Sequence, residues 1–162
     1  PRLIIPFYTI NGKLFALQAR AIGESKLRYI TIKLQEDHPL VYGLERVDFN
    51  KCVYIFEGPF DSMFIDNSIA VGGADLSRVA DKFKDKVLVF DNQPRNAQLV
   101  SKMEEVIKEG HAVVIWPDNL DEKDINDMVL RGMDVPKILD VINRNTFSNT
   151  AALLALSQWR KV

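Results

Sequence analysis

Three apolar stretches that each run into carboxylates place the strongest limit on what this chain can fold into. Residues 53–56, 87–90 and 112–116 are short continuous runs of apolar, β-prone residues. Such runs are typical of strands that are buried on both faces, as in a parallel sheet. Glu57 follows the first run and Asp91 the second, while the third leads into an acidic loop. The pattern predicts an α/β fold in which acidic side chains follow the central strands.

The acids are separated by about one strand–helix–strand unit. Positions 57 and 91 are 34 apart, and positions 91 and 124 are 33 apart; a βαβ unit takes roughly 30 residues or more. Parallel strands meet a ligand at their carboxyl ends, so Glu57, Asp91 and Asp124 are expected at one edge of the sheet. Converging carboxylates repel one another unless protons or a cation intervene. Because Mg²⁺ prefers oxygen ligands and keeps waters for a phosphate substrate, we expect a site for Mg²⁺, or for Mn²⁺ in its place.

The first 50 residues follow a different pattern. Strands are expected over residues 3–8, 14–20 and 29–33, and Asn11-Gly12 fits a two-residue hairpin turn of type I′ between the first two. From residue 51 the chain alternates strands with helices. Capping residues, helical spacing and glycines predict helices over 62–66, 75–83, 97–109, 125–131, 136–143 and 153–159.

Together these patterns predict a mostly parallel sheet flanked by helices and preceded by a small β-rich basic subdomain. The expected boundaries are 1–50 for the β-rich subdomain, 51–145 for the α/β domain and 146–162 for a C-terminal helix. Asp61 follows Gly58-Pro59 and is interpreted as the N-cap of the helix over 62–66 rather than as a site residue.

The charges of the chain are balanced overall but segregated. The formal net charge is −1, so no global field attracts the protein to nucleic acid. The first 33 residues nevertheless contain Glu24 as their sole acid and six bases: Arg2, Lys13, Arg20, Lys26, Arg28 and Lys33. The stretch predicts either a local basic patch that binds a polyanion or merely solvated strand faces.

The residue inventory excludes several other classes. One cysteine, Cys52, and two histidines form neither a disulfide nor a structural zinc site, and Cys52 is expected to be a small buried residue. There is no apolar run of 18 residues and no signal peptide pattern, so we expect a soluble, intracellular protein with no membrane partner. Because the chain begins with Pro1 rather than Met, it is expected to be a fragment.

The acids lie in three short motifs that resemble those of a known protein family. Residues 57–61 (Glu-Gly-Pro-Phe-Asp), 91–93 (Asp-Asn-Gln) and 123–127 (Lys-Asp-Ile-Asn-Asp) resemble the three motifs of the Toprim domain of DnaG-type primases, topoisomerases and some nucleases. Shorter matches before residue 45 follow the order of the basic subdomain that precedes Toprim in replicative primases. The resemblance covers about residues 1–145 and is greatest to the RNA polymerase part of the primases of T4-like bacteriophages.

The resemblance implies an activity and assigns roles. The activity is RNA primer synthesis by metal-dependent nucleotidyl transfer, with Glu57, Asp91 and Asp124 as catalytic residues. The implied metal ligands are Glu57, Asp91, Gln93, Asp124 and Asp127, and the implied nucleic-acid or nucleotide contacts are Arg20, Arg28, Lys33 and Arg95. The implied partners are a single-stranded DNA template, ribonucleoside triphosphates and a replicative helicase, in the host cytoplasm if the chain is encoded by a phage.

One position departs from the family pattern. The second acid of the Asp-x-Asp motif is here the amide Gln93, whose oxygen can still bind a hard cation but contributes no charge. Two alternatives therefore stay open beside the primase. One is a Toprim nuclease that uses the same carboxylates, and the other is a non-catalytic Toprim module that binds nucleic acid or docks to a helicase.

Overall fold

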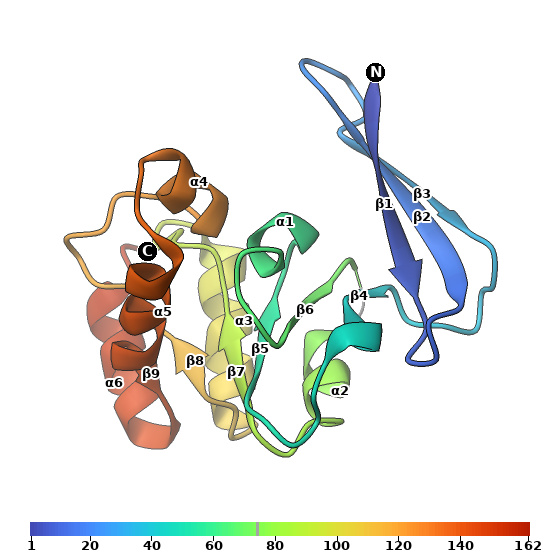
Figure 1. Ribbon diagram of the computed structural model, residues 1–162. Coiled ribbons are helices and arrows are strands. Elements are labelled where there is room, and N and C mark those ends of the chain that lie inside the picture. The colour runs from blue at the N-terminus through green and yellow to red at the C-terminus, as the bar shows by residue number, and fades with distance from the viewer. Residues whose placement is uncertain (74) are drawn as a thin grey trace.

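The computed structural model describes residues 1–73 and 75–162, which build two sheets (Figure 1). The first is antiparallel, with the order β1-β2-β3, and consists of β1 (Arg2–Tyr8), β2 (Leu14–Ala21) and β3 (Tyr29–Lys33). It stands to one side of the α/β body in Figure 1. These three strands lie where the sequence predicts them, over residues 3–8, 14–20 and 29–33, to within one residue at each end.

The turn between β1 and β2 differs from the predicted type I′ turn. A type I′ turn needs a positive φ at both central residues, yet among the two only Gly12 has one, at 75°. The loop instead spans residues 9–13, where the Thr9 N–H donates to the Lys13 carbonyl at 2.8 Å. The register then shifts beside Phe15, so that both Phe15 and Ala16 are buried. The bulge lets two successive residues enter the core, which a regular two-residue hairpin would prevent.

The second sheet has the predicted, mostly parallel arrangement. Its order is β4-β6-β5-β7-β8-β9, with β6, β5, β7 and β8 parallel and an antiparallel strand at each edge. Its strands are β4 (Val41–Tyr42), β5 (Val53–Phe56), β6 (Ser68–Val71), β7 (Lys86–Val89), β8 (Val113–Val114) and β9 (Thr146–Phe147). The two edge strands are two residues long, too short to produce a periodic signal in the sequence.

The helices also follow the predicted order, with differences at their ends. They are the 3₁₀ turn η1 (Leu44–Arg46), α1 (Pro59–Ser62), α2 (Leu76–Ala80), α3 (Ala97–Lys108), α4 (Ile125–Leu130), α5 (Val135–Arg144) and α6 (Asn149–Trp159). The helix predicted over 62–66 is wrong: α1 begins at Pro59 after the N-cap Gly58, because proline suits the first turn of a helix. Helix α6 begins four residues before the predicted start.

The core lies on both faces of the central strands. Residues 53, 55 and 56 of β5 are at most 2% exposed, and residues 87–89 of β7 are also buried. Helix α3 buries Leu99, Val100, Met103, Val106 and Ile107 against the sheet, on the face that its sequence predicts. Each such side chain contributes roughly 1.5–3 kcal/mol through burial. This packing fixes the strands whose carboxyl ends carry the acids.

The small sheet is attached to the larger one at one end. Ile5, Phe7 and Phe15 are buried, and the ring of Phe7 meets that of Tyr42 on β4 edge to face, with 5.7 Å between centroids. Strand β4 thus belongs to the larger sheet although it falls within residues 1–50. All five residues of β3 are exposed. In the described part of the chain, no helix has the length and apolar character needed to cross a bilayer.

Candidate active site

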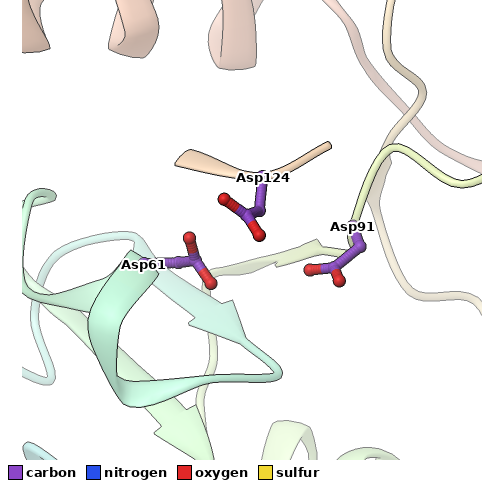
Figure 2. Close-up of side chains that lie close together, drawn as sticks. All are labelled: Asp61, Asp91 and Asp124. Carbon is purple, nitrogen blue, oxygen red and sulfur yellow. The ribbon is translucent and has the colours of Figure 1, made fainter. Parts of the chain in front are cut away.

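Three aspartates converge above the carboxyl ends of the central strands. Asp61 lies on α1, Asp91 follows β7 by two residues, and Asp124 immediately precedes α4 (Figure 2). One carboxylate oxygen from each residue lies within 4.8 Å of the other two, and all three side chains are partly buried. Three carboxylates at this separation form a set of hard oxygen donors of the kind that binds a divalent cation.

Local structure holds each carboxylate in place. Asp124 is the N-cap of α4 and accepts a hydrogen bond from the Asp127 N–H at 2.9 Å. Asp61 accepts one from the Asn126 N–H at 3.0 Å, which ties α1 to the start of α4. Asp91 lies 3.1 Å from the Lys123 ammonium, which is also 3.8 Å from Asp124. The oxygens that remain free of these bonds are available to a ligand.

Burial makes the ionised form of these carboxylates costly. It raises the pKa of Asp61 to about 6; the hydrogen bond from Asn126 opposes this rise, whereas the charges of Asp124 and Asp91 add to it. Burial also raises the pKa of Asp91, against the hydrogen bond and charge of Lys123. A cation among the three would relieve both the repulsion and the desolvation cost.

Glu57 stands beside this triad. The ammonium of Lys102, on α3, lies 3.2 Å from Glu57 Oε1 and 5.7 Å from the centroid of the Phe90 ring. Glu57 lines the same cleft as the triad but is not among the three acids that meet within 4.8 Å. Its role as catalytic residue or ligand therefore stays a prediction.

Basic residues also line the cleft that contains the triad. The cleft has a volume of about 370 Å³, and its lining includes Arg20 of β2, Tyr29 of β3 and Arg28, which directly precedes β3. The guanidinium of Arg20 lies 4.3 Å from the ring centroid of Phe60 on α1 and 5.7 Å from that of Tyr29. Stacking on aromatic rings holds an arginine in place while leaving its charge available. Two predicted nucleic-acid contacts, Arg20 and Arg28, thus line the same cleft as the predicted acids.

Of the other predicted site residues, one shares the cleft of the triad and three lie elsewhere. Asp127 lines the same cleft as the triad. Gln93 and Arg95 line a separate cavity of about 550 Å³ beside Trp159 and Lys161, and Gln93 Oε1 accepts a hydrogen bond from Asn96 at 3.1 Å. Lys33 lines a third cavity together with Arg78 and Lys82, and its ammonium is 3.9 Å from Glu36. Neither Gln93 nor Lys33 shares the cleft of the three aspartates.

Asp61 is the member of the triad that the sequence interpretation missed. The sequence predicts an N-cap at Asp61, but Gly58 occupies that position and Asp61 is the third residue of α1. The available signal is its place in the motif at residues 57–61, where Asp61 is a second acid within the short segment that directly follows β5. With Asp61 present, the site has three carboxylates despite the amide at Gln93.

Comparisons with known proteins agree with this geometry. No protein-family model matches the chain. The DNA primase of Enterobacteria phage T4 is 36% identical over 166 residues, an alignment that covers the whole chain and 48% of the phage protein. The chain thus spans about half the length of this curated relative.

Solved structures show the same fold. The Escherichia coli primase catalytic core superimposes with a TM-score of 0.72 and 14% identity over 94% of the chain and 55% of that structure. A DnaG primase catalytic domain bound to single-stranded DNA gives the same TM-score at 13% identity, over 94% of the chain and 54% of that structure. The resemblance to Toprim-domain DNA primases is therefore confirmed: the chain is related over its whole length to the phage T4 protein and shares the fold of the DnaG catalytic cores.

Proposed function

We propose that this chain carries the nucleotidyl-transfer site of a DNA primase, which synthesises RNA primers on a single-stranded DNA template. The observation that carries the proposal is the cleft whose lining contains Asp61, Asp91 and Asp124 together with Arg20 and Arg28. A polymerase needs both features, because carboxylates hold the cation and arginines hold the phosphates. The sequence relationship to the T4 primase and the DNA-bound DnaG structure support the same activity.

The three aspartates fit a magnesium ion as the cofactor. Their donors are oxygens within 4.8 Å of one another, and burial has already removed part of their hydration. Glu57 and Asp127 line the same cleft and are candidates for further ligands, direct or through water. Bound there, Mg²⁺ would neutralise phosphate charge and lower the pKa of the attacking 3′-hydroxyl.

The remaining residues of the cleft would position the substrates. Arg20, which lies close to the rings of Phe60 and Tyr29, would contact the triphosphate or the template backbone together with Arg28. Such contacts fix register rather than read sequence. The ion pair with Lys102 would hold the Glu57 carboxylate at the edge of the cleft, where it could accept the proton of the attacking hydroxyl. A replicative helicase remains the protein partner that the family resemblance implies.

Primer synthesis on a single-stranded template tests the proposal. The wild-type chain, Glu57→Gln, Asp91→Asn and the control Asp121→Asn would be incubated with labelled ribonucleotides and Mg²⁺. Asp121 is an exposed acid of the same loop that does not line the triad's cleft. We expect primers from the wild type and the control, and none from the two site variants, which should remain folded. Undiminished synthesis by Glu57→Gln and Asp91→Asn would contradict the proposal.

A labelled DNA strand in the same reaction separates the primase from the alternatives. Metal-dependent shortening of the strand without ribonucleotide incorporation would identify a nuclease that uses these carboxylates. DNA binding without Mn²⁺ binding would identify a non-catalytic module. Gln93 is the sequence feature that favours the latter, but the carboxylate of Asp61 supplies the third acid without it.

A further inference from the structure

The backbone N–H and the whole side-chain amide of Asn92 take part in hydrogen bonds. Its backbone N–H donates to the Lys123 carbonyl at 2.6 Å. Its side-chain NH₂ donates to the carbonyls of Leu120 and Glu122 at 2.8 and 3.1 Å. Its side-chain oxygen accepts a hydrogen bond from the indole N–H of Trp159 at 3.2 Å. A side-chain amide offers two donors and one acceptor oxygen, and here all of them are used.

These bonds join the two loops that carry two of the acids. Asn92 directly follows Asp91, and the carbonyls that it binds belong to the residues just before Asp124. Residues 115–124 form neither helix nor strand. In the described part of the chain, every hydrogen bond that joins residues 118–123 to another element is donated by Asn92. The ion pairs of Lys123 with Asp91 and with the neighbouring Asp124 add to these bonds.

We infer that Asn92 is a positioning residue that sets the separation of Asp91 and Asp124, and that Trp159 of the C-terminal helix orients it. The inference rests on the proposed function, since it concerns the ligands of the proposed metal. Asparagine suits the position because a carboxylate could not donate to the two carbonyls. An aspartate would also add a negative charge beside three others.

Trp159 connects the last helix to this arrangement. Its side chain is 4% exposed, and its N–H fixes which way the Asn92 amide faces, since the oxygen must point to the indole and the NH₂ to the loop. The Lys161 N–H also donates to the Pro94 carbonyl at 2.8 Å, so the chain after α6 is bound to the loop that follows Asp91. The C-terminal helix therefore supports the site as well as covering the core.

The test compares Mn²⁺ affinity with stability. Wild type, Asn92→Ala, Trp159→Phe and the control Tyr54→Phe would be titrated with Mn²⁺ while the electron paramagnetic resonance of the free ion is recorded. Thermal unfolding would be measured in EDTA and in Mn²⁺. The control loses one hydrogen bond, from the Tyr54 hydroxyl to Asn143 at 2.8 Å, at a place that does not line the cleft.

We expect Asn92→Ala to raise the Kd for Mn²⁺ on the order of 10-fold, as is typical when a residue that orients metal ligands is removed. Trp159→Phe should raise the Kd by a smaller factor, and Tyr54→Phe should leave it unchanged. The stabilisation produced by Mn²⁺ should shrink in the same order. If Asn92→Ala does not fold, the comparison of Trp159→Phe with Tyr54→Phe decides.

Two results would overturn the inference, and they are distinguishable. If the wild type binds Mn²⁺ and both site variants bind it equally well, Asn92 and Trp159 stabilise the fold without positioning ligands, and the proposed function stands. If the wild type itself binds no Mn²⁺, the metal site of the proposed function fails together with the positioning role.

Discussion

Replacing Asp61 with asparagine should stabilise the metal-free protein while removing its metal site. The pKa of Asp61 rises from 3.8 to about 6 on folding, mainly because the carboxylate is buried. A difference of about two pKa units corresponds to about 3 kcal/mol, so above pH 6 the ionised side chain opposes folding by roughly that amount. An asparagine in the same place carries no charge, and its oxygen can still accept the hydrogen bond from the Asn126 N–H.

The stability difference between Asp61→Asn and the wild type should depend on pH. Because the folded-state pKa of this acid is raised, the wild type loses stability as pH rises between about 4 and 6. Near pH 4 the carboxyl group is protonated in the folded state and about half protonated in the unfolded state, so most of the advantage of Asp61→Asn is gone, and below about pH 3 it disappears. At pH 8 the free energy of unfolding of the variant should exceed that of the wild type by about 3 kcal/mol. For a chain of this size, that difference corresponds to a Tm higher by roughly 6–12 °C.

The assay is chemical denaturation at pH 4 and pH 8 in EDTA, followed by thermal unfolding with and without Mn²⁺. Asp121→Asn, an exposed acid of the neighbouring loop, is the control and should change stability by at most about 0.5 kcal/mol. Mn²⁺ should raise the Tm of the wild type more than that of Asp61→Asn. Equal or lower stability of Asp61→Asn at pH 8 in EDTA would refute the argument that a buried charge is held here for a ligand.

The remaining predictions concern the cations around the triad. Lys123→Met should tighten Mn²⁺ binding about 2- to 5-fold, because it removes an ammonium 3.1 Å from Asp91 that competes with the metal; this is the range expected for one partly exposed ion pair. Calorimetric titration would measure the change in Kd. Weaker binding by the variant would mean that Lys123 helps to assemble the site. Arg20→Ala should weaken the binding of a fluorescent single-stranded oligonucleotide. It should also reduce the slope of log K against log salt concentration by about the amount of one phosphate contact. The control Lys108→Ala, at the far end of α3, should change neither the affinity nor the slope. An unchanged salt slope in Arg20→Ala would remove that arginine from the interface.

The sequence predicts the parts of the site that regular structure places. Strands β5 and β7 are apolar runs of the length expected for buried strands, so the positions of Glu57 and Asp91 follow from them. Asp124 also follows, because its side chain caps α4. The hydrophobic spacing of α3 likewise predicts which of its residues are buried.

The rest depends on contacts between distant residues. Asp61 looked like a helix cap because capping is a local signal, whereas its actual partner, the Asn126 N–H, is 65 residues away. Gln93 belongs to the same short motif as Asp91, but loop spacing does not determine side-chain direction, and Gln93 lines a different cavity. The edge strands β4 and β9 exist only because β6 and β8 offer them hydrogen bonds.

The measurement that tests the central claim most directly is anomalous diffraction from crystals soaked in Mn²⁺. The account predicts a peak bounded by the carboxylates of Asp61, Asp91 and Asp124, and no such peak in Asp91→Ala crystals treated in the same way. A second soak with a ribonucleoside triphosphate should retain the peak in the wild type. If neither soak yields a peak between these three residues at millimolar Mn²⁺, the acids do not form a metal site and the account is contradicted.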